Sequence, residues 1–310
     1  MVKVKRGTYL PTSFAKPSKQ AGKIAKKLQR ARKKSGDKSI KSLGSKRNYE
    51  QALTSIAKKI QLQTGAALRD LGVDDAVDYL IDRSAEVHQS TLDLERQAIE
   101  KMMLLVTFKL NSRQKLPIIQ SELKQILKSR RYTREQIHLI INHQRMQHAL
   151  SSQIAYQAGL RAHELLTIRP IHQQRPDARP SLKMKFDGRP GIKYTVVGKG
   201  GLTREINIPH NLSLLLESLK FDTPRKITDR NIYYDQYYDI GGGQKWSSSF
   251  SSACKRALGW SNGAHGLRHT YVQERMTELG ILGHKREIGL KIVSQEIGHF
   301  RPSIIEIYLR

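Results

Sequence analysis

The chain has 310 residues, with 55 Lys and Arg against 27 Asp and Glu, so its formal net charge is +28. This length allows two domains, and a hydrophobic share of 38% is enough to build a core. Such a charge repels itself unless a polyanion is close, so nucleic acid is the first candidate partner and a membrane surface the second.

Cysteine content and hydropathy narrow the class of protein further. Cys254 is the only cysteine, which excludes an internal disulfide and a cysteine-based zinc site and fits a reducing compartment. No apolar run approaches the roughly 20 residues that a membrane span needs, and the N-terminus lacks the apolar stretch of a signal peptide. We therefore expect a cytoplasmic protein that does not insert into a membrane.

Residues 1–47 are predicted to form a basic arm. Residues 1–50 hold 16 Lys and Arg but only two acidic residues, Asp37 and Glu50. Ile24 and Leu28 would share one face of a short helix around residues 21–33, but little else there could build a core. A solvated tail and a DNA-binding arm both fit this composition. In the second case the contacts would come from Lys26, Lys27, Arg30, Arg32, Lys33 and Lys34.

Residues 48–110 are predicted to form a helical domain, because apolar side chains recur at helical spacing. The first run is Tyr49, Leu53, Ile56 and Ile60. Residues 111–131 are expected to be a linker, since Asn111, Ser112 and Pro117 break the pattern, and its end carries two further candidate DNA contacts, Arg130 and Arg131.

Residues 132–310 are predicted to form a second domain, mainly helical with a small antiparallel sheet. Thr133 and Gln136 form a capping box for a helix, and Gly159 ends the helix that follows. Strands are expected at 182–186, 192–197 and 203–208. Helices are expected at 212–219, 247–258, 267–279, 288–297 and 302–308. The fold class is therefore α+β with helices dominant.

Four short motifs in this second domain carry chemistry together, although each alone is weak. They are a Gly-Leu-Arg-x-x-Glu-Leu stretch, a Gly-Lys-Gly turn, a His-x-x-Arg-His stretch, and a Gly-His pair followed nine residues later by a tyrosine. In order, their polar members are Arg161, Glu164, Lys199, His265, Arg268, His269, His299 and Tyr308.

Each of these residue types suits phosphodiester cleavage by a side-chain oxygen. Arg161 and Arg268 can neutralise the charge that develops on the phosphate oxygens. A tyrosine hydroxyl with a pKa near ~10 needs help to lose its proton, which His265 could take or orient. Lys199 on a glycine turn could protonate the leaving oxygen, and His299 could donate a hydrogen bond to the phosphate.

The motif set resembles the tyrosine recombinase family, also called phage-type integrases. The family pattern of Arg, Lys in a β-turn, His-x-x-Arg, His or Trp, and Tyr is matched by Arg161, Lys199, His265, Arg268, His299 and Tyr308. The likeness covers about 130–310 strongly and 48–110 loosely, as a core-DNA-binding domain. It implies a tyrosine-recombinase-like catalytic domain, with Glu164 and His269 as supporting residues.

The resemblance also implies the reaction and the partners. Tyr308 would attack DNA and keep the 3′ phosphate, with no cofactor and no metal. The partner would be double-stranded DNA, bound by a homo-tetramer on paired sites, with accessory DNA-bending proteins, in the nucleoid. Two residues follow Tyr308 in the given sequence, whereas many family members carry a further segment that docks onto a neighbouring protomer, so the resemblance leaves the mode of oligomerisation open.

Two other functions stay open from the sequence. A type IB topoisomerase shares the chemistry but works alone and exchanges no partners. A non-catalytic nucleic-acid-binding protein would explain the charge but not the complete set of polar residues. Assembly on paired DNA sites would distinguish a recombinase from a topoisomerase. Formation of a covalent complex with DNA would distinguish it from a non-catalytic binding protein.

Overall fold

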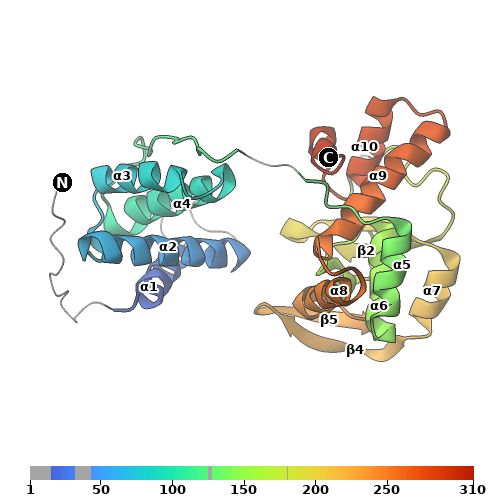
Figure 1. Ribbon diagram of the computed structural model, residues 1–310. Helices are drawn as coiled ribbons and strands as arrows, with labels where there is room; N and C mark the ends of the chain where they lie inside the picture. The colour runs from blue at the N-terminus through green and yellow to red at the C-terminus, as the bar shows by residue number, and fades with distance from the viewer. Residues whose placement is uncertain (1–14, 32–42, 125–127, 180) are drawn as a thin grey trace. The chain divides into compact units, whose positions relative to one another are not determined.

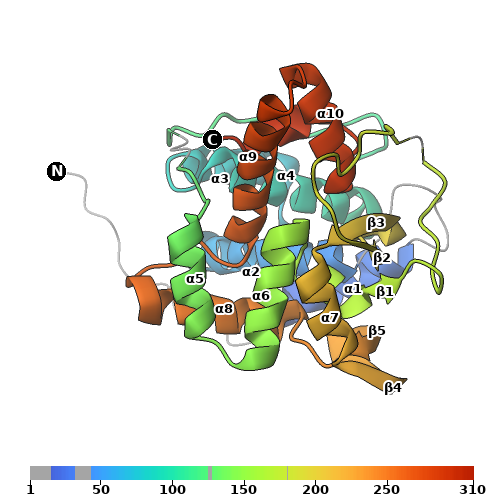
Figure 2. The same ribbon diagram turned by 90° about the vertical axis from the view of Figure 1, so that its right-hand side faces the viewer.

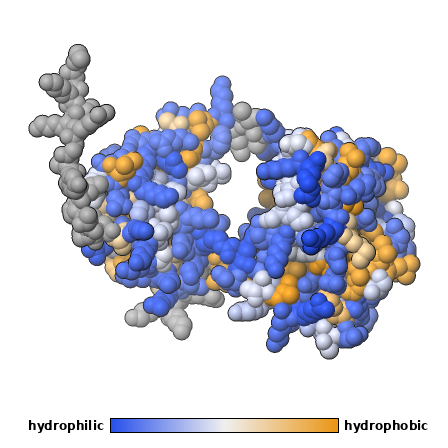
Figure 3. Space-filling view, turned by 60° about the horizontal axis from the view of Figure 1, so that its bottom comes forward, coloured by the Kyte–Doolittle hydropathy of each residue, from blue (hydrophilic) through white to orange (hydrophobic). Residues whose placement is uncertain are grey.

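The computed structural model describes residues 15–31, 43–124, 128–179 and 181–310. The chain divides into two compact units, Met1–Ile126 and Leu127–Arg310, called here the helical unit and the C-terminal unit (Figure 1). The surface seen in Figure 3 is largely hydrophilic over both units, as the composition requires.

The described part of the helical unit is a bundle around one apolar core. Each helix buries one side, and Leu28, Leu53, Leu80 and Ile99 have no exposed surface. The elements are α1 (Pro17–Arg30), α2 (Leu43–Thr64), η3 (Leu68–Asp70), α3 (Val73–Ser84), α4 (Gln89–Met102) and the π-helical turn η4 (Met103–Thr107).

Two expected boundaries of this unit were wrong. Part of the predicted arm is the helix α1, which packs on α2 because Ala21, Ile24 and Leu28 lie on one face at helical spacing. The first part of the predicted linker also packs against the helical unit. Leu116 is buried in the same core, and its backbone N–H donates to the Glu100 carboxylate. Arm residues 1–14 and 32–42, with Arg32, Lys33 and Lys34, lie outside the described residues.

The C-terminal unit is built around α6 (Met146–Ala158) (Figure 2). The helices α7 (His210–Glu217), α8 (Gly243–Leu258) and α9 (His265–Ile281) and the strand β3 (Thr203–Ile208) all pack against α6. Two further α-helices are α5 (Arg134–Asn142) and α10 (Arg286–Glu296). A three-stranded antiparallel sheet has the order β1 (Arg169–Pro170), β2 (Ile192–Val197), β3 (Thr203–Ile208). The predicted class, mainly α with a small antiparallel sheet, is confirmed.

Local signals place the helix ends near the site. The capping box forms as expected, with the Thr133 hydroxyl accepting from the Gln136 backbone N–H. Gly159 ends α6 in the left-handed region at φ +60°, and a Cβ there would lie 2.7 Å from the Tyr271 ring. Only glycine allows this turn with the tyrosine so close, and the turn sets the direction of the next residues.

The strand predicted at 182–186 is wrong, because these residues form turns. Phe186 has φ +66°, and the backbone N–H groups of Leu182 and Phe186 donate to the side chains of Gln295 and Glu296. With these donors used by side chains of a helix end, the segment does not pair as a strand. The sheet's third strand is β1 instead.

A separate two-stranded ribbon, β4 (Lys220–Asp229) with β5 (Ile232–Tyr238), was missed. Its turn places Arg230 and Asn231 at φ +50° and +63°, the backbone that a tight type I′ hairpin requires. Pro224 and the mostly exposed β4 hide the apolar alternation on which strand prediction depends.

We predict that Leu28→Ala destabilises the helical unit by about 2–5 kcal/mol, because it opens a cavity under α1. The loss should appear as faster hydrogen exchange of amides in α2. Lys27→Ala, on the exposed face of the same helix, should change stability by less than about 0.5 kcal/mol. Equal exchange rates in wild type and Leu28→Ala would show that α1 does not pack on the unit in solution.

Candidate functional site

Seven of the eight motif residues meet in the C-terminal unit although the chain separates them widely. Arg161 follows the left-handed end of α6, and Glu164 begins the 3-10 turn η5 (Glu164–Thr167). His265, Arg268 and His269 occupy the first turns of α9. His299 follows α10, and Tyr308 follows the 3-10 helix η7 (Pro302–Ile307).

Glu164 is the centre of this cluster and is fully buried. Arg161 Nη1 donates to Glu164 Oε1 at 2.8 Å, and the Arg161 backbone N–H donates to Oε2 at 2.8 Å. Arg204 Nη2 donates to Glu164 Oε2 at 2.8 Å, and Arg268 Nη1 lies 3.8 Å from the same oxygen. One carboxylate therefore holds three guanidinium groups.

The charge of Glu164 is maintained by these neighbours. Burial by itself raises the pKa of the Glu164 carboxyl, but Arg204, Arg268 and Arg161 outweigh burial and hold the pKa well below its usual range. With three cations around one anion, the cluster keeps a positive excess. Such a site suits a phosphate group.

Arg204 was not among the predicted residues. It lies on β3 with almost no exposed surface, and its guanidinium joins Glu164 to the backbone carbonyl of Glu296. A signal was present in the sequence: Arg204, Ile206 and Ile208 share one face of the strand, and all three are buried. A charged residue that shares a strand face with buried isoleucines indicates a buried partner of opposite charge.

Arg268 is fully buried and is held by main-chain oxygens. It donates through Nη1 to the carbonyl of Gly159 and through Nη2 to that of Ile297. These carbonyls belong to the ends of α6 and α10, where helical carbonyls lack partners and carry partial negative charge. Burial and the nearby Arg161 lower the pKa of Arg268 to about 10, so the group remains a cation at neutral pH.

Tyr308 lies against the cluster with its hydroxyl 3.2 Å from His299 Nε2. The same nitrogen is 3.0 Å from Arg161 Nη2. Because a guanidinium only donates, Nε2 must be the unprotonated nitrogen of His299, with the proton on Nδ1. His299 Nε2 thus faces both Arg161 and Tyr308 as an acceptor, and its hydrogen bond to a DNA phosphate stays a prediction.

The histidines of this site are kept neutral. Burial first, and then the charge of Arg268, lower the pKa of His265 to about 3 and that of His299 to about 4. Burial and Arg130 lower the pKa of His269 to about 4. The His265 and His269 rings lie 5.7 Å and 4.7 Å from the Tyr308 ring, measured between centroids, so both are neighbours of the tyrosine.

Lys199 is the one motif residue that the structure does not bring into the cluster. It is exposed on the turn η6 (Lys199–Gly201) between β2 and β3, where Gly200 and Gly201 have φ +83° and +86°. Among the described residues its ammonium has no hydrogen bond or ion pair. The base of the turn does adjoin the site, because a Cβ on Gly198 would lie 3.3 Å from Glu164 Oε1.

The other predicted DNA contacts lie outside this cluster. Arg130 and Arg131 are exposed before α5, and Arg130 donates to the carbonyl of Asn262. On α1 of the helical unit, three predicted residues line a basic cleft of about 690 Å³ that also includes three cations not predicted. The six are Lys26, Lys27, Arg30, Lys23, Arg69 and Lys109.

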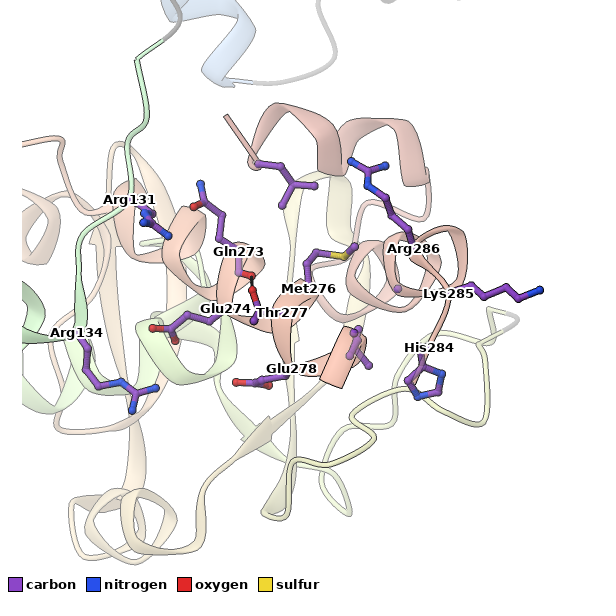
Figure 4. Close-up of a pocket in the computed structure, with 14 residues that line it drawn as sticks. Arg131, Arg134, Gln273, Glu274, Met276, Thr277, Glu278, His284, Lys285 and Arg286 are labelled. Carbon is purple, nitrogen blue, oxygen red and sulfur yellow. Dashed lines mark hydrogen bonds between the residues drawn. The ribbon is translucent and has the colours of Figure 1, made fainter. Parts of the chain in front are cut away.

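The C-terminal unit has a hollow of its own, of about 630 Å³, which runs along α9 to the start of α10 (Figure 4). Of the candidate residues that the sequence suggests, only the predicted DNA contact Arg131 lines it, and no residue of the Glu164 cluster does. Gln273 in its wall donates to the backbone carbonyl of Tyr308 at 2.8 Å, so the cavity borders the segment that carries the tyrosine. The chemistry of the cluster thus lies in a different place from this hollow.

Two kinds of feature are absent from the described ranges. They contain no group of three or more His, Cys, Asp or Glu side chains that could hold a metal ion. Likewise, no helix in this part of the chain is both long and apolar enough to span a membrane.

We predict that the C-terminal unit loses stability as the pH falls. Each site histidine has a pKa in the folded protein below its unfolded value of about 6.5. Its contribution to the free energy of unfolding is therefore fully present above about pH 6.5 and is lost as the pH falls towards the folded pKa. His269→Gln should reduce the loss between about pH 7 and about pH 5 by about 1–2 kcal/mol.

Fluorescence-detected urea unfolding measures this, because both tryptophans, Trp246 and Trp260, lie in the C-terminal unit. His138→Gln, at an exposed position, is the control and should keep the wild-type slope. The same slope in His269→Gln and wild type would contradict burial of a neutral His269.

Comparison with known proteins agrees with this architecture. No family model and no curated protein sequence matches the chain. Among solved structures, a lambda integrase tetramer bound to a Holliday junction is similar with a TM-score of 0.58 and 13% identity, over 93% of this chain and 76% of that chain. A lambda integrase dimer bound to a COC′ core site is similar with a TM-score of 0.57 and 13% identity, over 97% of this chain and 82% of that chain.

The XerH site-specific recombinase bound to palindromic difH substrate gives a TM-score of 0.55 and 12% identity, over 96% of this chain and 94% of that chain. These structural neighbours are tyrosine recombinases, and at such identities the likeness concerns the fold. The chain therefore has the fold of the tyrosine recombinases, with a helical unit preceding the unit that carries the arginine cluster and Tyr308.

Proposed function

We propose that this protein cuts and rejoins DNA through a covalent 3′-phosphotyrosine formed by Tyr308, as a site-specific recombinase. One observation carries the proposal: the Tyr308 hydroxyl lies 3.2 Å from a neutral His299, directly beside a buried cluster of arginines. A nucleophile, a proton acceptor and a site for phosphate charge thus lie together. The fold of the structural neighbours supports the same reading.

The proposed step exchanges one phosphoester bond for another. The Tyr308 oxygen bonds to phosphorus while the bond from phosphorus to the 5′ oxygen breaks. The tyrosine proton passes to His299 Nε2, and Arg161 and Arg268 stabilise the charge on the non-bridging oxygens. In the reverse step a 5′ hydroxyl attacks the phosphotyrosine, so the bond is resealed without an external energy source.

Lys199 is proposed to protonate the departing 5′ oxygen. Its turn begins beside Glu164, and the two glycines after it allow backbone that other residues rarely adopt. Because the arginines and this lysine supply the positive charge and the proton, the proposed reaction uses no metal and no cofactor. His265 and His269 are proposed to support Tyr308 through their ring contacts.

The proposed partner is double-stranded DNA. The net charge of +28 and the basic cleft on α1 favour contact with phosphates, and Arg130 and Arg131 add exposed cations at the start of the C-terminal unit. We extend this to a homo-tetramer on paired sites, by analogy with the lambda integrase tetramer on a Holliday junction. Accessory DNA-bending proteins and a place in the nucleoid belong to the same proposal.

We predict that Tyr308→Phe binds DNA like the wild type but forms no covalent adduct, because it lacks only the attacking oxygen. The assay uses a pool of random-sequence duplexes, each nicked near its centre so that a cleaved end diffuses away. Adducts are isolated on a denaturing gel, and mass spectrometry of the modified peptide locates the tyrosine.

Tyr233→Phe is the matched control, since Tyr233 is 83% exposed on β5 and should leave adduct formation unchanged. An adduct that persists in Tyr308→Phe would assign the attack to another residue. No adduct with the wild type would favour a non-catalytic DNA-binding protein. Plasmid relaxation without exchange between two duplexes would favour a topoisomerase.

We predict that Lys199→Ala cuts ordinary DNA at least about 100-fold more slowly, the usual size of a general-acid effect. On DNA with sulfur in place of the 5′ bridging oxygen it should recover most of the wild-type rate, since a thiolate leaves without a proton. The substrate is the duplex recovered in the capture above.

Arg161→Ala is the comparison, because a residue that stabilises the non-bridging oxygens is not replaced by a better leaving group. Lys193→Ala, an exposed lysine on neighbouring β2, should cut both substrates normally. Equal rescue of Lys199→Ala and Arg161→Ala would make Lys199 a phosphate contact rather than the acid.

A further inference from the structure

Glu296, the last residue of α10, is a buried carboxylate that the proposed chemistry does not use. None of its surface is exposed, and both of its oxygens are occupied. Arg275, itself fully buried, donates from Nη2 to Oε1 at 3.0 Å and from Nε to both oxygens at 3.1 Å. The Tyr271 hydroxyl donates to Oε2 at 2.8 Å, and the Phe186 backbone N–H to Oε1 at 3.0 Å.

The main chain at this point holds two arginines of the site. The carbonyl of Glu296 accepts from Arg204 Nη1, and the carbonyl of the next residue, Ile297, accepts from Arg268 Nη2. Each arginine is held from its other side as well, Arg204 by Glu164 and Arg268 by the Gly159 carbonyl. The end of α10 is therefore one of two supports for each guanidinium group.

The position of this helix end thus decides where the guanidinium groups lie. Carbonyls in the last turn of a helix have no partners within it and can follow any shift of that turn. The Glu296 carboxylate ties the turn to α9 through Arg275 and Tyr271, and to the preceding loop through Phe186. His299 comes three residues later and depends on the same turn.

We propose that Glu296 is a positioning residue for DNA cleavage: its carboxylate fixes the end of α10, whose carbonyls set Arg204 and Arg268 around Glu164. The inference rests on the proposed function for its consequence in catalysis, but the positioning itself concerns only the folded chain. A displacement of about 1 Å at such groups can cost on the order of 100-fold in rate.

The chain offers a matched control in Glu278. Its carboxylate also bonds Arg275, with Nη1 at 3.3 Å, and is bonded by Arg189 at 2.7 Å. It lies near the C-terminal end of α9 with a side chain that is 38% exposed. Within the described part of the chain, its carboxylate bonds Arg275 and Arg189 and forms no hydrogen bond or ion pair with Arg204, Arg268 or the end of α10. Glu296→Gln and Glu278→Gln each remove one charge from the surroundings of Arg275.

The first measurement is the set of arginine Nε–H signals in proton–nitrogen NMR spectra of the full chain. Arg204→Lys and Arg268→Lys assign two of the signals. We expect Glu296→Gln to move both and Glu278→Gln to leave both in place. The double variant Glu296→Met with Arg275→Met leaves no buried charge unpaired, so it keeps a folded form available, and it should move both signals as well.

The second measurement is adduct formation at saturating protein, on the duplex captured with the wild type. Glu296→Gln should slow the chemical step on the order of 100-fold while the affinity for that duplex stays the same, and Glu278→Gln should keep the wild-type rate. Thermal unfolding establishes that each variant is folded at the assay temperature.

Unmoved Arg204 and Arg268 signals in a folded Glu296 variant would overturn the proposal and make Glu296 a core ion pair only. So would an equal loss of rate in Glu278→Gln. If the wild type forms no adduct on any duplex, the proposed function fails, whereas the NMR comparison still decides whether Glu296 positions the arginines.

Discussion

The interaction on which the site depends is the contact of one buried carboxylate, Glu164, with three guanidinium groups. Arg161, Arg204 and Arg268 come from three separate segments and would repel one another without it. A buried charge is costly unless it is paired and hydrogen-bonded, and removing one partner from such a group typically costs about 3–5 kcal/mol. The same contact therefore stabilises the fold and concentrates positive charge.

The helix ends of the C-terminal unit are organised around this contact. Gly159 and Gly298 both adopt left-handed backbone, and a side chain on either would collide, with Tyr271 in the first case and Arg204 in the second. Close approach of these turns lets their carbonyls reach Arg268. The end of α6, the start of α9 and the end of α10 are thus fixed by the polar atoms that face the site, as well as by the apolar core behind them.

Much of this could be predicted because its signals are local. A capping box at Thr133 and a glycine at position 159 mark helix ends, and the motif residues can be identified by their type and spacing. The rest depends on partners distant in sequence. Arg204 shares the inward face of its strand with Ile206 and Ile208, but its partner Glu164 lies 40 residues away in the sequence. The strand β4 lacks apolar alternation, and residues 182–186 alternate although the N–H groups of Leu182 and Phe186 bond to side chains near the end of α10. Nor does spacing reveal that His299 accepts from Arg161.

The order of these residues along the chain has a consequence for synthesis. Tyr308 lies downstream of Glu164, of every arginine around it, and of His299. Domains fold largely as they emerge from the ribosome, so the basic helical unit can form while the tyrosine is still untranslated. The tyrosine is then added last, and its ring packs against Arg268 and the histidines that precede it. Under the proposed function, a nascent or prematurely ended chain binds DNA but has no tyrosine with which to break it.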